Sequence, residues 1–431
     1  MPNYHKKVTI KYPNENGRIG RLSMRSSQRK LQDGWGMKDA MKNTVTAIDF
    51  GTSKIVALVG ETSGRQRCDI IGAGFAAYAG FADGQWNDPA MLNQAIADAV
   101  HEAEQQGHMR VREVSVGVPG EFSRVYTVET KLDLQGADPH VTVRNIEDLF
   151  RKAVDELGQV RGVIIHRSPA WFMVDDGKKT LEPMGMRGSS LRSLVSFVVA
   201  DQFFLDDISE RFRSMNIAVN SFFSAPVGQA MLFVSDEERD RTAILVDVGY
   251  LNTEVMAIEG DALIFHQVIP MGGGNIAADV AYGLDIPLDS AENIKKSYVF
   301  NVAAEDETFT VPDRDGINKT FTRKEVAQVL EPRVEEIAEA VRDAIKASGV
   351  RLGSWSVAYL TGGGLAINRG ARDFFSGVLD RPVRDLPRKT GKMSSPIYTS
   401  ALGVLDVTID TLINANANRG IKAFFNNLFG G

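Results

Sequence analysis

The sequence predicts an α/β protein in which two similar domains enclose a cleft. Two stretches, 45–59 and 243–258, share one pattern: an apolar strand ends in Asp-x-Gly, and a second strand follows a short turn. A third stretch, 357–366, runs from an apolar strand into three consecutive glycines and then into a predicted helix. A repeat spaced by about half the chain indicates two related domains rather than a solenoid. Two such hairpins facing one another would clamp a ligand between the domains.

The first hairpin carries candidate phosphate and metal ligands. Gly51 lets the backbone approach a ligand closely, and Thr52 and Ser53 add hydroxyls to the backbone N–H groups of the turn. Asp49 ends the strand and could hold a hydrated Mg²⁺, which keeps several waters. Lys54 adds a positive charge beside them. Taken alone, this pattern also fits an ordinary hairpin turn.

Further candidates stand at the other turns. Asp247 and Gly249 hold the equivalent places in the second hairpin, so Asp247 is a second candidate for Mg²⁺ through water. The turn 362–364, with Gly362, Gly363 and Gly364, offers backbone N–H groups. Gly272 and Gly273 follow another strand and fit either a tight turn or a phosphate contact; their place after the second hairpin favours contact.

Composition excludes several classes of function. With 431 residues, 43% hydrophobic and 24% charged, the chain has the balance of a soluble globular protein of two to four domains. The net charge of −6 gives no support for nucleic-acid binding. Cys68 is the single cysteine, which rules out an intrachain disulfide and fits a reducing compartment. No apolar run approaches about 18 residues, so no transmembrane helix is predicted.

The two ends of the chain differ from the body in composition and in the spacing of their apolar residues. Residues 1–42 are rich in polar and basic residues, which favours a disordered tail. A basic arm for anionic lipid, or a natural start at Met37 or Met41, stay open as alternatives. At the other end, a polar linker over 414–418 precedes apolar residues spaced i, i+3, i+4, i+7 and i+8. They are Ile421, Phe424, Phe425, Leu428 and Phe429, flanked by Arg419 and Lys422. This pattern favours an interfacial membrane helix over a terminal helix docked on the body.

Periodicity places the remaining elements. Helices are predicted over 89–106, 145–157, 204–216, 289–298 and 395–412, another opening at Ala225, and a long one from Glu331 to Ala347. Strands are predicted over 69–77, 114–118, 163–166, 171–174 and 191–200. Glu292 and Lys295 share a helix face at i and i+3, which by itself indicates a surface ion pair.

Hairpin, hairpin and late glycine turn, in this order, resemble the actin/Hsp70/sugar-kinase superfamily over about residues 44–413. Within it, the sequence is similar to the FtsA family of actin-like bacterial division proteins. The segments that carry this resemblance are 48–61, 272–281, 291–295, 330–333, 360–364 and the C-terminal amphipathic stretch.

The resemblance implies an actin-like fold of two RNase H-like domains around a nucleotide cleft, with a small inserted α/β domain of the SHS2 type. Domain I would comprise 43–120 and 204–240, with the insertion at 121–203. Domain II would comprise a core, 241–275 and 354–396, and an outer subdomain, 276–353. A closing helix on domain I, 397–413, and a linker with a membrane-targeting helix, 414–431, would follow; 1–42 would be the tail.

The resemblance also implies a function: an ATP- and Mg²⁺-binding protein that polymerises with itself and tethers the FtsZ ring to the membrane. It would bind the FtsZ C-terminal peptide, other division proteins and anionic lipid. It would act as a peripheral protein on the cytoplasmic face of the inner (plasma) membrane, at the division site. In this family the acid and lysine that correspond to Glu292 and Lys295 lie beside the ribose and base.

Some residues depart from the family pattern. Tyr250, Leu251 and Asn252 stand where glycines are usual, Gly274 and Ala277 replace polar residues, and Ala225 stands where a catalytic Gln or Glu is expected. The resemblance therefore implies an adaptor that is at most a slow ATPase. Two alternatives remain: a pilus-assembly adaptor of the same fold, and a metabolite kinase in which Asp247 would be the catalytic base.

Overall fold

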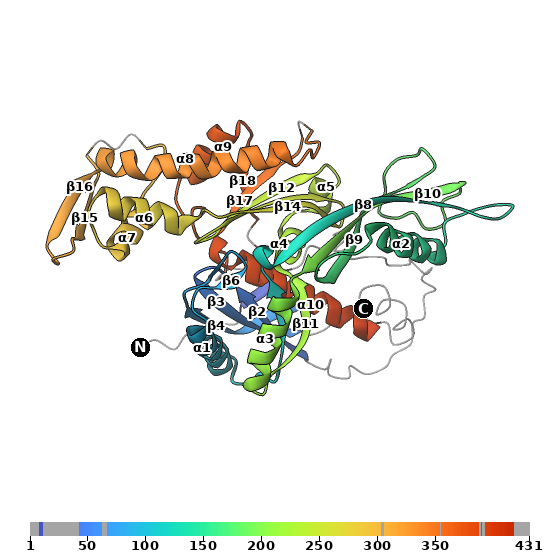
Figure 1. The fold of residues 1–431 in the computed structure, drawn as a ribbon, viewed down its shortest axis with the longest axis horizontal. Helices are drawn as coiled ribbons and strands as arrows, with labels where there is room; N and C mark the ends of the chain where they lie inside the picture. The colour runs from blue at the N-terminus through green and yellow to red at the C-terminus, as the bar shows by residue number, and fades with distance from the viewer. Residues whose placement is uncertain are drawn as a thin grey trace, which may run out of the picture.

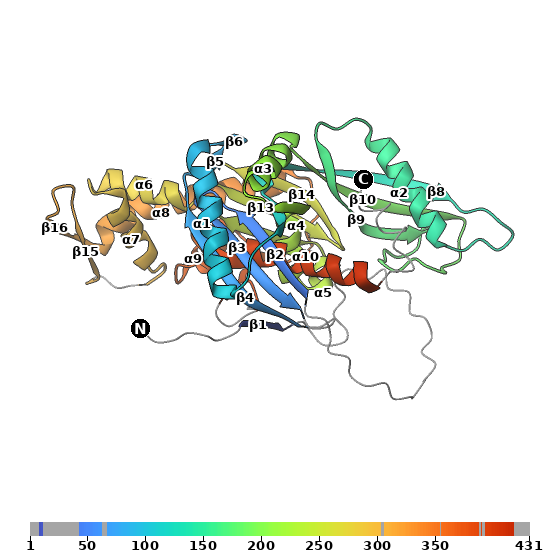
Figure 2. The ribbon, with the colours of Figure 1, turned by 90° about the horizontal axis from the view of Figure 1, so that it is seen from below.

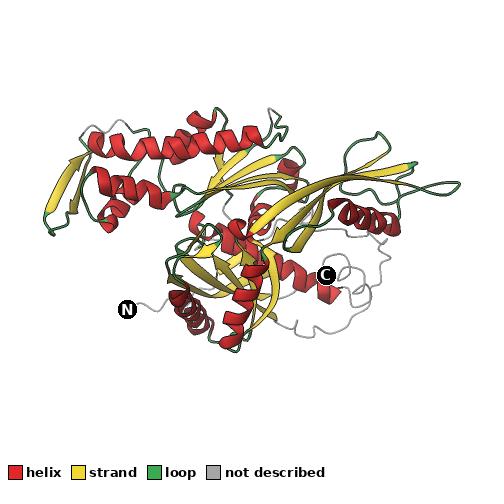
Figure 3. Ribbon diagram, viewed as in Figure 1, coloured by secondary structure: helices red, strands yellow, loops and turns green. Residues whose placement is uncertain are grey.

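The computed structural model describes residues 8–11, 43–62, 67–302, 306–353, 355–387, 389 and 393–417. It is an α/β structure, as predicted, whose two large sheets belong to two domains that meet at the centre of the molecule (Figure 1). A small sheet with one helix extends from one end, and a helical subdomain with a two-stranded hairpin extends from the other (Figure 3).

Domain I is built on a six-stranded sheet of order β1-β4-β3-β2-β7-β11. Its strands are β1 (Val8–Lys11), β2 (Asn43–Phe50), β3 (Lys54–Thr62), β4 (Arg67–Ala77), β7 (Glu113–Val118) and β11 (Ala218–Ser224), with a small hairpin of β5 (Phe81–Ala82) and β6 (Gln85–Trp86). Helices α1 (Pro89–Gly107) and α3 (Gln202–Ser214) cover one face, and α4 (Ala225–Phe233) and α10 (Thr399–Ala417) cover the other (Figure 2). Alternate residues of β2 serve the two faces, since Ile48 packs with α1 and α3 whereas Ala47 packs with α4 and α10.

The inserted domain is an antiparallel sheet of order β8-β10-β9, with α2 packed on it. Its elements are β8 (Ser123–Asp133), α2 (Val143–Leu157), β9 (Val163–Val174) and β10 (Ser190–Ala200); the short 3₁₀ helix η1 (Gly120–Phe122) precedes β8. The two strands predicted over 163–166 and 171–174 form one strand, β9. Pro169 within it is tolerated because β9 is an edge strand with a register shift opposite Val195.

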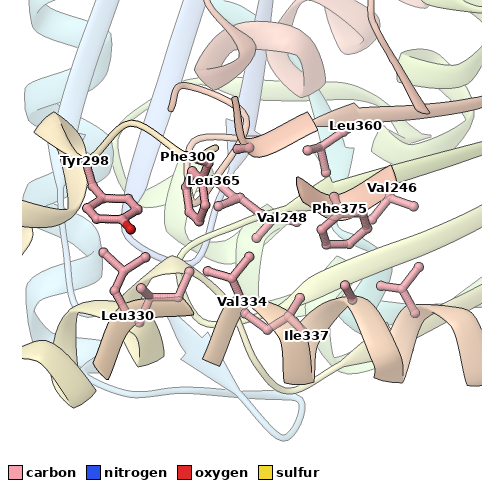
Figure 4. Packing of buried hydrophobic residues seen from close by; sticks show 14 of the residues in the cluster. Val246, Val248, Tyr298, Phe300, Leu330, Val334, Ile337, Leu360, Leu365 and Phe375 are labelled. Atoms are coloured by element: carbon pink, nitrogen blue, oxygen red, sulfur yellow. The ribbon is translucent and has the colours of Figure 1, made fainter. Parts of the chain in front are cut away.

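Domain II has a five-stranded sheet of order β14-β13-β12-β17-β18. Its strands are β12 (Ala243–Val248), β13 (Thr253–Glu259), β14 (Ala262–Ile269), β17 (Ala358–Thr361) and β18 (Val383–Asp385). The other elements are α5 (Asp236–Arg239), α6 (Gly273–Gly283), α7 (Leu288–Ser297), β15 (Thr308–Pro312), β16 (Asn318–Thr322), α8 (Arg323–Ala347), α9 (Ala371–Leu379) and η2 (Pro396–Tyr398). Val334 and Ile337 of α8 pack toward Val246 and Phe375 beneath the sheet (Figure 4).

Three predictions of element boundaries were wrong. Helix α8 begins at Arg323 rather than at Glu331, because Thr322 and Glu325 form a capping box, and Pro332 lies inside the helix. No helix directly follows 362–364: a turn runs to Gly370, whose φ of +78° precedes α9. Helix α10 continues to Ala417, through most of the expected linker.

The structure describes only part of the two chain ends for which predictions were made. Within the tail expected to be disordered, β1 pairs antiparallel with β4, whose edge offers free backbone groups. The rest of 1–42, and the predicted membrane residues 419–429, lie outside the described residues. Among the helices that the structure describes, none has the length and hydropathy needed to cross a bilayer.

Helices α4 and α10 pack closely where they cross, at Gly228 of α4 and Gly403 of α10. A Cβ placed on Gly228 would lie 2.6 Å from the carbonyl oxygen of Gly403, and one on Gly403 would lie 2.3 Å from the Gln229 nitrogen. The two backbones therefore touch without intervening side chains. This close approach brings Gln229 of α4 next to Thr399, the first residue of α10.

We expect Gly403→Ala to destabilise the protein by roughly 1–3 kcal/mol, because the added methyl group forces the two helices apart. Gly377→Ala, in α9, is the matched control: no atom lies within 4 Å of a Cβ at that position. The control should be neutral or gain up to about 1 kcal/mol from helix propensity. Urea unfolding measures both, and equal stability of the two variants would contradict the described crossing.

Candidate functional site

The first hairpin joins β2 to β3 as predicted. The Gly51 N–H donates to the Lys54 carbonyl at 3.0 Å and closes the turn, and the Tyr78 hydroxyl donates to the Gly51 carbonyl at 2.8 Å. Gly80 has a φ of +74°, and a Cβ there would lie 2.0 Å from the Thr52 carbonyl oxygen. The turn is therefore held from behind by a backbone that admits no side chain.

The second hairpin joins β12 to β13 and contacts the first hairpin directly. The Gly249 N–H donates to the Asn252 carbonyl at 2.8 Å, which closes the turn. The Leu251 N–H donates to Thr52 Oγ1 at 3.0 Å. The predicted meeting of the two hairpins is thus present, since one hydrogen bond joins residues 199 positions apart in the chain.

The glycine turns interlock with the second hairpin. The Gly364 N–H donates to the Val248 carbonyl at 2.8 Å, the Gly273 N–H to the Gly249 carbonyl at 2.9 Å, and the Gly274 N–H to the Tyr250 carbonyl at 2.6 Å. A Cβ on Gly364 would lie 2.1 Å from the Gly249 carbonyl oxygen, so the contact requires glycine.

These contacts bear on the predicted phosphate ligands. The N–H groups of Gly273 and Gly364 are engaged with hairpin carbonyls, and the Gly272 N–H donates to Asn275 Oδ1 at 2.9 Å. Phosphate binding by these three residues stays a prediction, and it would require these donors to be shared or released. Gly362, with a φ of +95°, lies against Asp247, because a Cβ there would be 2.2 Å from Asp247 Oδ1.

The two predicted metal ligands are carboxylates with little access to water: Asp49 is 7% exposed and Asp247 is half-buried. Asp49 Oδ1 accepts a hydrogen bond from Ser400 Oγ at 2.8 Å, and Asp247 Oδ2 accepts one from Gln229 Nε2 at 2.6 Å. Burial raises the pKa of Asp49 to about 6 and that of Asp247 to about 7, although these hydrogen bonds and the charge of Lys54 act in the opposite direction. A bound cation would stabilise the ionised form of both carboxylates.

Lys54 completes this charged group. Burial lowers its pKa, while the charges of Asp49 and Asp247 act to raise it. Its Nζ also lies 5.1 Å from the centroid of the Tyr398 ring. One lysine between two carboxylates leaves a net negative charge when all three are ionised, which suits a divalent cation.

Gln229 and Ser400 belong to this site but were not predicted. Gln229 Nε2 donates to Thr399 Oγ1 at 2.8 Å as well as to Asp247, and the Thr399 hydroxyl lies 3.1 Å from that of Thr361. Ala225, which stands where the family resemblance implies a catalytic Gln or Glu, lies on the same helix. Gln229 stands four residues later, on the same helix face, and that spacing was the signal available.

Glu254 and His266 form a further pair that was missed. Glu254 is the register partner of Asp247 across the hairpin, and its charge acts to raise the pKa of both buried aspartates. Its Oε1 accepts the Gly120 N–H at 3.2 Å, and its Oε2 lies 3.1 Å from His266 Nε2. This contact links domain II to the start of the inserted domain.

Glu292 and Lys295 pair as predicted, but not on the surface. Lys295 Nζ lies 2.8 Å from Glu292 Oε2 and donates to the Gly273 carbonyl at 2.9 Å, and its side chain is 2% exposed. Burial lowers the pKa of Lys295, and the contact with Glu292 opposes this. The pair therefore belongs to the site around α6.

A cavity of about 550 Å³ adjoins the hydroxyl network of Asp247. Thr361 and Thr399 form part of its wall, together with Ala366, Ile367 and Asn368. Within the part of the chain that the structure describes, no donor reaches the buried Oδ1 of Asn368. The volume is in the range of small-molecule pockets, and the unused acceptor could accept a hydrogen bond from a ligand. The sequence did not predict this cavity.

The donor set fits a hydrated Mg²⁺ better than a protein-caged metal. No cluster of three or more His, Cys, Asp or Glu side chains suited to a metal occurs among the described residues. Mg²⁺ commonly binds through one or two carboxylates, keeps several waters and takes phosphate oxygens. Asp49 and Asp247 offer such a pair, with Thr52, Ser53 and Lys54 beside it.

Comparisons with known proteins agree with this description. Residues 244–403 match the family model described as "Cell division protein FtsA". The chain is 25% identical over 372 residues to the cell division protein FtsA of Neisseria meningitidis, which covers 84% of this chain and 89% of that protein. It is 26% identical to FtsA of Pseudomonas aeruginosa, with 84% and 88% covered, and 25% identical to FtsA of Bacillus subtilis, with 83% and 82% covered.

Two solved structures show the same fold. A PilM-PilN type IV pilus biogenesis complex contains a chain that is 16% identical, with a TM-score of 0.58 and coverage of 85% of this chain and 98% of that one. MreB5 of Spiroplasma citri bound to ADP is 14% identical, with a TM-score of 0.50 and coverage of 88% and 99%. The predicted actin-like fold and the predicted resemblance to the FtsA family are confirmed.

We expect stability to fall as pH rises through the window set by Asp247. The pKa is about 7 when folded and near its ordinary value of 3.8 when unfolded, so the folded state holds more protons between those values. The loss of folding stability that follows from ionising Asp247 grows from about pH 4, is complete above about pH 7, and is on the order of 1–4 kcal/mol. The substitution Asp247→Asn removes this loss, because an amide does not ionise.

Thermal unfolding at pH 5 and pH 8 provides the measurement. The variant should gain over wild type at pH 8 and gain much less at pH 5. The exposed Asp176 provides the control substitution, Asp176→Asn, whose difference from wild type should not change with pH. An equal effect of Asp247→Asn at both pH values would contradict the raised pKa.

Proposed function

We propose, from the resemblance to the FtsA family of cell division proteins, that this chain binds Mg²⁺ and ATP between its two domains, polymerises, and tethers FtsZ to the membrane. The observation that supports nucleotide binding most strongly is the pair of desolvated carboxylates at two touching hairpins, with Lys54 beside them. An isolated pair of this kind is costly, and a bound cation would offset the cost.

Different residues would contact different parts of the nucleotide. Asp49 and Asp247 would hold hydrated Mg²⁺, which neutralises the phosphates, and Thr52, Ser53 and Lys54 would contact phosphate oxygens. Glu292 and Lys295 would lie beside the ribose and base. One solved structure of the same fold, MreB5 of Spiroplasma citri, is bound to ADP, which supports placing a nucleotide in this fold.

Rapid hydrolysis is not expected from these residues. Ala225 has no polar side-chain atom to orient a water, and Gln229 donates its amide to Asp247 rather than into an open site. We therefore propose an adaptor whose nucleotide serves binding and assembly. A pilus-assembly adaptor would share the fold, and binding of an FtsZ C-terminal peptide separates the two functions.

Asp49→Asn should weaken Mg-ATP binding by at least about tenfold, because a neutral amide cannot balance the cation. The loss should shrink when Mg²⁺ is replaced by EDTA. Isothermal calorimetry measures both affinities, and Asp176→Asn is the control of equal charge change. Equal affinity of Asp49→Asn and wild type with Mg²⁺ present would remove Asp49 from the site.

Membrane attachment would come from residues 419–429, which follow the end of α10 at Ala417. Five apolar side chains, partly buried in the interface, must offset the ordering of about nine residues, at roughly 1–2 kcal/mol each for the backbone. One copy should bind weakly. A polymer should bind far more tightly, because each later helix engages at high effective concentration.

Phe424→Glu combined with Phe425→Glu should abolish pelleting with anionic liposomes and the recruitment of FtsZ to them, while Mg-ATP binding survives. Asn426→Glu with Asn427→Glu adds the same charge at polar positions and should retain most of the pelleting. Sedimentation of protein, FtsZ and liposomes tests all three chains together. If the phenylalanine variant pelleted as wild type does, the segment would not be the membrane anchor.

A further inference from the structure

The tip of the second hairpin contacts three parts of the molecule through three consecutive residues. Leu251 donates its N–H to Thr52 of the first hairpin, and Asn252 Nδ2 donates to Glu121 Oε2 at 3.2 Å. Tyr250 accepts the Gly274 N–H of α6 through its carbonyl at 2.6 Å. These contacts anchor the backbone of the tip to the first hairpin, to η1 and to α6, while the Tyr250 side chain keeps its own rotatable bonds.

The Tyr250 ring lies over the Glu292–Lys295 pair. Lys295 Nζ is 5.8 Å from the centroid of the ring, and a Cβ on Gly274 would lie 3.0 Å from two ring atoms. Burial raises the pKa of Tyr250, and the negative charges of Glu292 and Asp289 raise it further. The ring thus packs between the start of α6 and the acid and lysine of α7.

The Glu292 carboxylate keeps acceptor capacity beside its ion pairs. Its Oε2 lies 2.8 Å from Lys295 Nζ and its Oε1 lies 3.5 Å from Lys296 Nζ, and each carboxylate oxygen has a further lone pair. A carboxylate oxygen in this state could accept a ribose hydroxyl. The ring that covers it makes a cation–π contact with the same lysine.

We propose that Tyr250 is a gate over the nucleoside subsite: its ring occupies the face of Glu292 and Lys295 that a nucleoside must use, and it swings away when a nucleotide binds. This inference rests on the proposed function. The ring lies against Lys295 of the α7 pair, so we expect the gate to act on the nucleoside and to leave phosphate binding unchanged. The apparent affinity for nucleotide then equals the affinity of the open form multiplied by the fraction of molecules in which the ring has moved away.

The gate should affect the binding of Mg-ATP but not that of inorganic tripolyphosphate, although both ligands contain a chain of three phosphates. Tyr250→Ala should bind Mg-ATP roughly tenfold more tightly than wild type, as expected when the closed form makes up about nine tenths of the population. Inorganic tripolyphosphate with Mg²⁺ should bind wild type and Tyr250→Ala equally. Tyr250→Phe keeps the ring and should resemble wild type with both ligands. Tyr282→Ala, on the exposed ring of α6, is the control that removes a tyrosine elsewhere.

Calorimetric titration of the full-length wild type and of each of the three variants with both ligands gives eight affinities, and thermal unfolding checks that each variant is folded. Equal or weaker Mg-ATP binding by Tyr250→Ala, with wild type binding normally, would overturn the gate and leave the proposed function standing. If neither chain bound Mg-ATP or Mg-tripolyphosphate, both proposals would fall. Tighter binding of tripolyphosphate by the variant would also overturn the gate, because the ring would then cover the phosphate site.

Discussion

The desolvation of the Asp49 and Asp247 carboxyls at the meeting point of the two domains is the constraint on which the site depends. Desolvation raises the pKa of both carboxyls, and a lysine and two polar side chains only partly relieve the cost. The carbonyl oxygens of 248–250 each accept a hydrogen bond from a glycine N–H of another turn. These hydrogen bonds hold the backbone next to Asp247 and oppose its relaxation toward water.

Helix α10 links this constraint to the rest of the chain. Its first two residues reach the site, since Thr399 contacts Gln229 and Ser400 contacts Asp49, and its last described residue lies just before the proposed membrane segment. The helix can lie so close to α4 because glycines meet at the crossing. One helix therefore runs from the carboxylates toward the C-terminal segment, which suits the proposed coupling between a nucleotide site and membrane attachment.

Local patterns predicted much of this arrangement. The hairpin acids, the glycine turns and the Glu292–Lys295 pair were all found, because each consists of neighbouring residues whose spacing reflects their chemistry. Gln229, Ser400 and Glu254 were missed because their role depends on packing: the hydrogen bond from Ser400 to Asp49 spans 351 positions. The start of α8 was misplaced because proline favours the first turn of a helix, which is where Pro332 lies in a helix that starts at Glu331. The capping box at Thr322 and Glu325 marks the true start.

Proton release on Mg-ATP binding tests the role of the carboxylate pair most directly. Calorimetry at pH 6.5 in two buffers of different ionisation enthalpy measures it. Because the pKa of Asp247 is raised to about 7, a cation that binds the ionised form should expel more than about half a proton per site, and the release should vanish near pH 8.5. Equal binding enthalpies in the two buffers at pH 6.5 would contradict the claim that Mg-ATP binds at these buried aspartates.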